Sequence, residues 1–371
     1  MIVHIIGQTL YTKDMYEFIN NNFEHDGHIF MTGRAYDPEA TAPIGIGRAA
    51  GDVQIISPKK IFSYIGLLKK CDGIIIHGIF SPKHLLIIAL SKKWLKKCCW
   101  VIWGGDIYVH NKENKTLKEK ITDFVKKIYA KKIGYIAPLV DKDYDLAKEW
   151  YNVSGIKIPI NYPTPLQNSD VIRMLSAACA DKSCKSHEAV LNVMIGNSAT
   201  ETNCHKEALD ILAKYKNENI RIYLPLSYGF TGYENYAEKI IAYAERTFGK
   251  DKIVPIRDKM KSDEYCRLLS DMDVAVFYNN RQQAMGNIAI MLEAGAKVYI
   301  RDDTNMWNHY IERGYSLENA FDIPGQDFTT FAHYNEAVKE KNVGLIKGYT
   351  NPANLKQKWE NLFNVMLTGD K

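Results

Sequence analysis

The chain has 371 residues, of which 46% are hydrophobic and 25% are charged, and its formal net charge is +5. This composition is typical of a globular protein, and the length predicts two domains rather than one. No apolar run reaches the roughly 18 residues of a membrane-spanning helix, and the N-terminus MIVHIIGQTL lacks the basic flank of a signal peptide, so we expect a cytoplasmic protein.

The charge and cysteine distributions narrow the possible partners. Seven scattered cysteines form no C-x-x-C pair, and no two histidines are spaced i, i+4, which argues against a disulfide framework and a zinc site. Residues 1–185 hold 26 Lys+Arg against 18 Asp+Glu, whereas the remainder holds 22 against 25. The basic first half predicts a polyanionic or anionic-membrane partner. Nucleic acid is not expected, because no zinc finger, RNA-binding signature or arginine-rich arm occurs.

Short β-branched runs alternate with amphipathic stretches along the chain, which is typical of parallel sheets with crossover helices. The sequence predicts an α/β protein of two doubly wound, Rossmann-like domains that face each other across a cleft, with a C-terminal helix packing back on the first domain. The predicted boundaries are 1–185, 186–345 and 346–371, with a linker near 160–189. The predicted strands are 2–6, 53–56, 73–77, 98–103, 133–137, 192–195, 220–224, 253–256, 274–278 and 297–300.

Several short patterns imitate known sites without their context. GIGRAAG at residues 45–51 precedes a strand instead of following one, so it predicts a surface loop and not a dinucleotide fingerprint. The pair Asp271 and Asp273 also precedes its strand and is interpreted as a helix end. DKDYD at 141–145 is typical of a helix start. We therefore expect no metal and no cofactor.

The stretch YNNRQQAMGN follows the apolar run 274–277 and precedes a helical pattern. This puts Arg281, Gln282, Gln283 and Gly286 at a strand-to-helix turn, where free helix N–H groups and a positive dipole end attract anions. Arginine adds a bidentate donor suited to a diphosphate. The alternative is a capped surface turn with the arginine in a salt bridge.

A second turn of the same kind follows the first strand of the second half. Gly196, Asn197 and Ser198 come directly after Ile195, and glycine permits a close backbone approach while the other two side chains can donate hydrogen bonds. Helix capping alone is the alternative. Two further candidates are Tyr228, which either stacks on a base or sugar or packs in a turn, and Glu293, which either reaches ribose hydroxyls or faces solvent.

Polar residues also end two strands of the first half. His77 follows three isoleucines in IIIHGIF, and Asp106 follows the run CWVIWGG. An imidazole or a carboxylate at this edge is a candidate general base for an acceptor hydroxyl. A structural histidine and a turn-capping aspartate are the alternatives.

Seven motifs together resemble one family. They are HGIF, WGGDIY, YPT, VMIGNSATETNCHKEAL, YLPLSYG, RQQAMG and NMWNHY, within residues 70–315. In order and approximate spacing they resemble those of bacterial TDP-N-acetylfucosamine:lipid II N-acetylfucosaminyltransferases (4-alpha-L-fucosyltransferase-like enzymes).

The resemblance implies a metal-independent GT-B glycosyltransferase at the cytoplasmic face of the bacterial inner membrane. Its donor would be a TDP- or UDP-linked deoxy-amino sugar, and its acceptor an undecaprenyl-diphosphate-linked saccharide of a surface polysaccharide, such as enterobacterial common antigen or O-antigen. By motif match, Asp106 and His77 would lie on the acceptor side, and Gly196, Asn197, Ser198, Arg281, Gln282 and Gln283 on the donor side.

A lysine-rich segment of the first half fits a peripheral membrane location. Its apolar residues Leu117, Ile121, Phe124, Val125 and Ile128 recur at helical spacing. The lysines expected to face anionic lipid are Lys93, Lys96, Lys97, Lys126, Lys127 and Lys131. A core-packed helix with solvated lysines is the alternative.

Two other functions remain compatible with the sequence. One is a non-catalytic sugar-nucleotide-binding or scaffold protein of a polysaccharide assembly complex. The other is a sugar-nucleotide epimerase of similar fold, which would release a free sugar product without an acceptor.

Overall fold

The computed structural model describes residues 1–7, 10–32, 54–56, 61–183, 189–229 and 234–369. The chain divides into two compact units, residues 1–164 with 352–371 and residues 165–351. The predicted loop at residues 45–51 lies outside the described residues. Within the described part of the chain, no helix combines the length and the apolar character that crossing a membrane requires.

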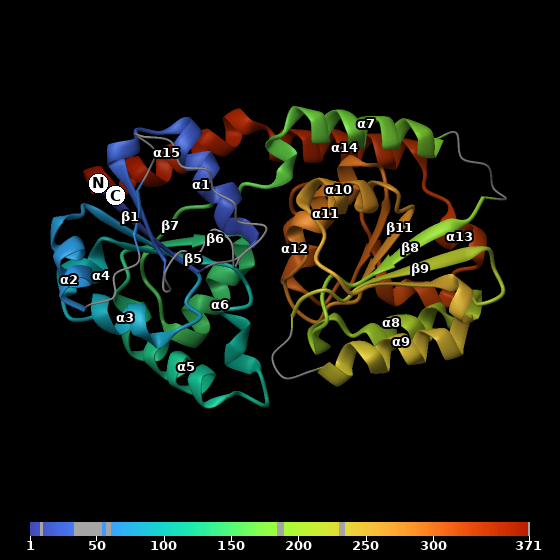
Figure 1. Ribbon diagram of the computed structural model, residues 1–371, viewed down its shortest axis with the longest axis horizontal. Helices are drawn as coiled ribbons and strands as arrows, with labels where there is room; N and C mark the ends of the chain where they lie inside the picture. Colours follow the sequence, from blue (N-terminus) through green and yellow to red (C-terminus); the bar gives the residue numbers. More distant parts are fainter. Residues whose placement is uncertain (8–9, 33–53, 57–60, 184–188, 230–233, 370–371) are drawn as a thin grey trace. The chain divides into compact units, whose positions relative to one another are not determined.

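The first unit is built on a parallel sheet in the order β3-β2-β1-β4-β5-β6-β7 (Figure 1). From β1 the chain adds β2 and β3 on one side and then β4 to β7 on the other, so the topological switch point lies between β1 and β4. Its strands are β1 (Ile2–Ile6), β2 (His28–Thr32), β3 (Gln54–Ile56), β4 (Gly73–His77), β5 (Cys98–Ile102), β6 (Tyr135–Pro138) and β7 (Ile156–Lys157). Its helices are α1 (Leu10–Asn22), α2 (Ile61–Lys70), α3 (Pro82–Ile88), α4 (Lys92–Lys96), α5 (Leu117–Tyr129), α6 (Asp141–Tyr151) and α15 (Pro352–Thr368).

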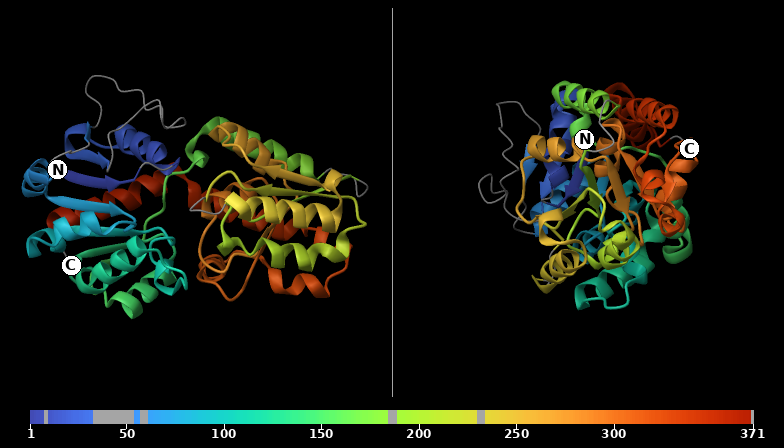
Figure 2. Two further views of the ribbon diagram at one scale, coloured as in Figure 1. Left: turned by 60° about the horizontal axis from the view of Figure 1, so that its bottom comes forward. Right: turned by 90° about the vertical axis from the view of Figure 1, so that its right-hand side faces the viewer.

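Alternating residues of these strands bury two different faces of the sheet. Ile74 and Ile76 pack beneath α2 to α6, whereas Ile75 packs with α1 and α15. Helix α15 lies beside the strands of this sheet (Figure 2) and buries Trp359, whose Nε1 donates to the carbonyl of Asn161 at 2.9 Å. The C-terminal helix is therefore an integral layer of the first unit.

The second unit repeats the topology with the strand order β10-β9-β8-β11-β12-β13. Its strands are β8 (Leu191–Ile195), β9 (Ile220–Pro225), β10 (Ile253–Ile256), β11 (Val274–Phe277), β12 (Lys297–Ile300) and β13 (Glu318–Asn319). Its helices are α7 (Ser169–Ser183), α8 (His205–Leu212), α9 (Glu234–Phe248), α10 (Ser262–Ser270), α11 (Met285–Glu293), α12 (Asn305–Ile311), α13 (Phe328–Ala332) and α14 (Glu336–Thr350).

The predicted doubly wound architecture is confirmed, but the predicted boundary at residue 185 is wrong. Helix α7 packs on α10 and α11 and belongs to the second unit, so the first crossing lies at residue 164 and the return crossing at 351. The strands β2, β7 and β13 were not predicted. Two of them pair through only two residues at a sheet edge, and this length carries no periodicity.

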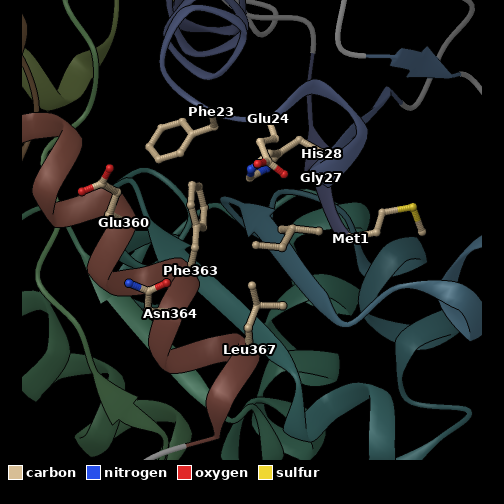
Figure 3. Close-up of a pocket in the computed structure, with 10 residues that line it drawn as sticks. Met1, Phe23, Glu24, Gly27, His28, Glu360, Phe363, Asn364 and Leu367 are labelled. Carbon is tan, nitrogen blue, oxygen red and sulfur yellow. The ribbon is translucent and has the colours of Figure 1, made fainter.

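A pocket lies at the amino ends of β1 and β2, between the ends of these strands and α15 (Figure 3). It is lined by His28, Phe363 and Leu367 among others. Doubly wound sheets bind ligands at the carboxyl ends of their strands, so we attribute this pocket to the packing junction of α15.

A chain of hydrogen-bonded histidines crosses the face of the first sheet that α15 covers. His4 Nε2 lies 2.9 Å from His28 Nδ1, and His4 Nδ1 lies 3.1 Å from His77 Nε2. His77 Nδ1 contacts the hydroxyl of Tyr162 at 2.9 Å. Burial lowers the pKa of His77 to about 3 and that of His28 to about 4, and it lowers the pKa of His4 well below its usual value. All three rings are neutral at neutral pH.

The buried histidines predict that the first unit loses stability in mild acid. Their folded-state pKa values are depressed below the unfolded value of about 6.5, so protons bind the unfolded chain preferentially. The contribution of the neutral histidines to the free energy of unfolding is fully present above about pH 6.5. It is lost as the pH falls below that value, by at most about 1.4 kcal/mol per histidine per pH unit. Urea unfolding between about pH 7.5 and about pH 5 measures this slope.

His4→Gln, which removes one titrating group, should reduce the slope of stability against pH. The matched control is His333→Gln, because His333 is exposed in the second unit and should leave the slope unchanged. Equal slopes for the wild type and His4→Gln would contradict a neutral, buried His4.

Candidate functional site

The turns that follow β8 and β11 contact each other at the carboxyl edge of the second sheet. The N–H of Asn280 donates to the carbonyl of Thr202 at 3.0 Å, and Thr202 Oγ1 donates to Gln283 Oε1 at 3.0 Å. The topological switch point of this sheet lies between β8 and β11. Doubly wound sheets bind ligands at such a point. The two turns that were predicted from the sequence to bind a ligand therefore form one continuous surface.

Asn203 holds the first turn in shape. Its Oδ1 accepts from the N–H of Asn197 at 2.9 Å, and its Nδ2 donates to the carbonyl of Ser198 at 2.9 Å and to Thr200 Oγ1 at 2.8 Å. Gly196 has φ of 68°, and a Cβ there would lie 2.6 Å from His205 Nε2. Only glycine fits this backbone approach.

Tyr228, at the end of the neighbouring strand β9, is joined to the same turn. Its hydroxyl accepts from Asn197 Nδ2 at 2.7 Å, and its carbonyl accepts from the N–H of Ala199 at 2.8 Å. The ring is half-buried. The structure thus brings Tyr228 together with the residues predicted at the first turn.

The second turn carries Arg281 at its outer end and two buried amides behind it. Arg281 is half-buried, and its Nη1 donates to the carbonyl of Gln282 at 2.9 Å. The side chains of Gln282 and Gln283 are 3% and 9% exposed. The guanidinium thus lies at the turn, and the amides line its interior.

Two helices begin at these turns without a side-chain cap. The N-cap residues are Cys204 for α8 and Ala284 for α11, and both have the left-handed backbone, with φ of 49° and 62°. This conformation costs roughly 1–2 kcal/mol for a residue with a Cβ. The uncapped N-termini present backbone N–H groups and the positive end of the helix dipole. A Cβ on Gly286, in the first turn of α11, would meet no atom within 4 Å.

Buried amide atoms of the two turns have no hydrogen-bond partner. Within the described residues these atoms are Asn197 Oδ1, Asn279 Oδ1, Asn279 Nδ2, Gln282 Oε1 and Gln283 Nε2. An unsatisfied buried polar group costs about 1–3 kcal/mol, so a ligand that pairs with several of them gains affinity. The set contains donors and acceptors, as recognition of hydroxyl or amide groups requires.

Three residues of this surface were not among the predicted site residues. They are Asn203, Asn279 and His205, each wholly buried. Burial lowers the pKa of His205 to about 4, and its Nδ1 contacts the hydroxyl of Tyr236 at 2.9 Å. Asn279 comes two residues after β11, and Asn203 and His205 lie within the motif VMIGNSATETNCHKEAL, but their burial and contacts could not be inferred from these positions.

Glu293 lies away from the two turns. It is the last residue of α11, about 12 Å along the axis from the first turn of that helix. It is 1% exposed, and burial raises the pKa of its carboxyl, an effect that the charge of Lys347 opposes. This position does not support the predicted contact with a ligand at the turns, and it is also not solvent-facing.

In the first unit, Asp106 is a buried structural acceptor. Its Oδ2 accepts from the N–H of Ile79 at 2.9 Å and from Trp100 Nε1 at 2.6 Å, and its Oδ1 accepts from the N–H of Trp103 at 3.0 Å. The side chain is 1% exposed. It therefore joins the turns after β4 and β5 and does not present a free carboxylate. His77 is likewise buried, and both its ring nitrogens are engaged.

The predicted membrane-facing lysines divide into two groups. Lys93, Lys96, Lys127 and Lys131 are exposed. Lys126 is fully buried. Its Nζ donates to the carbonyl of Asp106 and lies 4.8 Å from the ring centroid of Tyr151. The prediction that Lys126 faces the membrane is therefore wrong. Lys97 is also directed inward, since its Nζ donates to the carbonyls of Leu68 and Cys71.

The acidic pairs that imitated metal sites have structural contacts. Asp271 is the C-cap of α10, and Asp273 Oδ2 accepts from the N–H of Asn192 at 2.8 Å. Asp141 and Asp143 lie in the first turn of α6, as predicted. Across the described ranges, no group of three His, Cys, Asp or Glu side chains is arranged to hold a metal ion.

Asn203→Asp should unfold the first turn locally. The substitution replaces the Nδ2 donor by an oxygen that faces the oxygens of Ser198 and Thr200, and we expect a loss of about 2 kcal/mol in urea unfolding. Amide exchange of residues 196–204 should also accelerate. Asn217→Asp, on an exposed residue, is the matched control. Unchanged exchange would contradict the role of Asn203.

Comparisons with known proteins identify the family. Residues 51–333 match the family described as 4-alpha-L-fucosyltransferase, glycosyl transferase group 56. The fold is similar to a glycosyltransferase from Rickettsia africae ESF-5 (TM-score 0.66, 11% identity, covering 100% of this chain and 99% of that chain).

It is also similar to HepE of Anabaena in complex with UDP and glucose (TM-score 0.68, 9% identity, 98% and 99% covered) and to WaaG, a glycosyltransferase involved in lipopolysaccharide biosynthesis (TM-score 0.63, 9% identity, 99% and 99% covered). These likenesses show the GT-B fold. With the family match spanning most of its length, the chain belongs to the 4-alpha-L-fucosyltransferase family and is a GT-B glycosyltransferase.

Proposed function

We propose that this glycosyltransferase moves a deoxy-amino sugar, such as N-acetylfucosamine, from a TDP- or UDP-sugar to an undecaprenyl-diphosphate-linked saccharide. The reaction would take place at the cytoplasmic face of the bacterial inner membrane, during synthesis of a surface polysaccharide. The observation that best supports donor binding by the second unit is the contact between its two turns. HepE, which shares the fold, was solved with UDP-glucose, and this supports a nucleotide-sugar donor.

The diphosphate of the donor would bind at the uncapped N-termini of α8 and α11. Backbone N–H groups and the helix dipoles attract phosphate oxygens there, and the guanidinium of Arg281 adds paired donors. Negative charge grows on the diphosphate as the bond to the sugar breaks, so these groups stabilise the leaving group most in the transition state. On this proposal, no metal ion is needed for that step.

The buried amides would recognise the sugar or the nucleoside through hydrogen bonds. Asn279 and Gln283 offer unpaired donor atoms, and Asn197 and Gln282 offer unpaired acceptor atoms. A donor that lacks a matching hydroxyl or amide would leave these atoms unsatisfied, which disfavours its binding. This supports selection of the donor by hydrogen bonds and not by shape alone.

The acceptor saccharide would bind at the carboxyl edge of the first sheet. Three aromatic rings gather there: Trp103 lies 5.1 Å from Tyr162 and 6.2 Å from Phe80 between ring centroids. Phe80 is 48% exposed. Aromatic faces offer apolar contact to the C–H surfaces of a sugar ring. Asp106 acts here as a positioning residue, because it fixes the backbone on which Trp103 and Ile79 lie.

Two alternatives give different products. A scaffold or sugar-nucleotide-binding protein would bind the donor without releasing nucleoside diphosphate, and an epimerase would convert the donor without any acceptor. A panel of TDP- and UDP-sugars, assayed for thermal shift and then for nucleoside diphosphate release with and without lipid-linked acceptor, separates the three.

Arg281→Ala should lower kcat by about 10²–10³-fold, because it removes a charge-assisted donor from the departing diphosphate. The KM for the donor should change less, since the interaction strengthens as charge develops. Steady-state transfer assays measure both constants.

Arg257→Ala is the matched control in the same unit. Arg257 is exposed and paired with Glu238, so its loss should leave transfer unchanged. Transfer by Arg281→Ala at a rate near that of the wild type would reject the proposed donor site.

Asp106→Asn distinguishes a positioning residue from a general base. The new amide places N–H groups against the backbone N–H or indole donors that Asp106 now accepts from, so we expect a loss of about 1–3 kcal/mol in stability. Residual transfer should keep the pH profile of the wild type. Loss of the acidic limb of that profile, with stability unchanged, would instead identify Asp106 as the base.

A further inference from the structure

The solvent-exposed side of α5 and of the C-terminal end of α3, with Leu90 just after it, carries apolar side chains, which we name the α3/α5 stripe. It consists of Leu86, Leu90, Leu117, Ile121, Phe124 and Ile128. Helix α5 packs against α3 in the first unit, so the two helices are neighbours (Figure 1). Leu117, Leu90 and Phe124 are 74%, 67% and 63% exposed.

Helix α5 is amphipathic in the opposite sense to an ordinary surface helix. Leu117, Ile121, Phe124 and Ile128 are spaced by four, three and four residues, so they occupy one helix face, and all four are exposed. The opposite face buries Thr122, Asp123, Val125 and Lys126. Val125 is thus the apolar residue of this set that joins the core, while the stripe faces outward.

Positive charge surrounds the stripe. Lys120 and Lys127 lie four residues before and three residues after Phe124, so both flank it on the helix surface, and both are exposed. Residues 82–132 contain 13 lysines and four acidic residues. Three of these acids are engaged: Asp106 is buried, Glu119 pairs with Lys112, and Asp123 lies within ion-pair distance of His110, Lys115 and Lys127. The lysines of this segment therefore outnumber the acids even after these pairs are counted.

We propose that the α3/α5 stripe inserts into the interface of an anionic lipid bilayer. An apolar helix face with a lysine rim matches the two components of such a surface, since the side chains enter the acyl boundary and the lysines reach the anionic headgroups. The purpose of this contact rests on the proposed lipid-linked acceptor, but the binding itself does not require any substrate.

A second copy of the chain fits this surface less well than a bilayer does. A twofold interface would place the stripe against an identical stripe, which would bring two lysine rims of the same sign together. An anionic bilayer has the complementary charge. We therefore assign the stripe to lipid and treat self-association as an outcome of the test.

The stripe also reaches the edge where the acceptor would bind. Helix α3 begins five residues after the end of β4, and residues 103–116 connect the end of β5 to the start of α5. Leu117, the first residue of this crossover helix, therefore lies toward the carboxyl edge of the first sheet. The exposed Phe80 lies at the same edge. A bilayer on the stripe would therefore hold this edge near the headgroups, where a lipid-linked diphosphate sugar is anchored.

The test is binding to vesicles of phosphatidylglycerol and phosphatidylethanolamine, measured by sedimentation without donor or acceptor. The double variant Leu117→Ser/Phe124→Ser should weaken binding by about tenfold or more. The variant Lys120→Gln/Lys127→Gln should lose only the part of the binding that about 0.5 M salt also removes. Both pairs are exposed, so thermal unfolding should match the wild type.

Ile311→Ser is the matched control, because Ile311 is an exposed apolar residue outside the stripe, and it should bind vesicles as the wild type does. Binding by the serine double variant that equals wild-type binding would overturn the proposal. A wild-type dimer in sedimentation velocity that the same variant abolishes would assign the stripe to a second copy. Inactive transfer with intact vesicle binding would refute the proposed reaction and leave this inference standing.

Discussion

The proposed donor site of this glycosyltransferase depends on the hydrogen bonds of one asparagine side chain. Asn203 accepts from the backbone of Asn197 and donates to the oxygens of Ser198 and Thr200, so it fixes the loop between β8 and α8. That loop carries Thr202, which contacts the turn after β11 through its backbone and its side chain. Without this loop, the two helix N-termini would not form the one surface at which we propose that the diphosphate binds.

Local conformational cost and unsatisfied polar groups accumulate at this same surface. Ala284 and Cys204 have left-handed backbones, and the amides of Asn279, Gln282 and Gln283 leave buried atoms unpaired. Such features persist only where the surrounding structure holds them, and they concentrate at ligand sites. The first unit contrasts with this arrangement, because the polar groups of Asp106 and His77 are engaged and stabilise its own fold.

Periodicity predicted most of the fold, because buried parallel strands leave long apolar runs and a switch point follows from strand order. It identified the apolar face of α5 but not the direction of that face, since spacing alone does not say which side the core covers. Lys126 was therefore assigned to the surface and is buried. The sequence also placed Asp106 at the carboxyl edge of the first sheet, where the structure has it. It could not show that three N–H groups donate to its carboxylate, because these contacts form only in the folded turns. The roles of Asn203 and Asn279 depend on contacts within the folded loops.

Amide hydrogen exchange of the full chain, with and without the preferred nucleoside diphosphate, tests the donor site most directly. We expect the nucleotide to protect residues 196–204 and 281–288 together, because both turns would bind one diphosphate. We expect little change at 73–77 and 98–106 in the first unit without acceptor. Protection that omits the turn containing Arg281 would contradict the account.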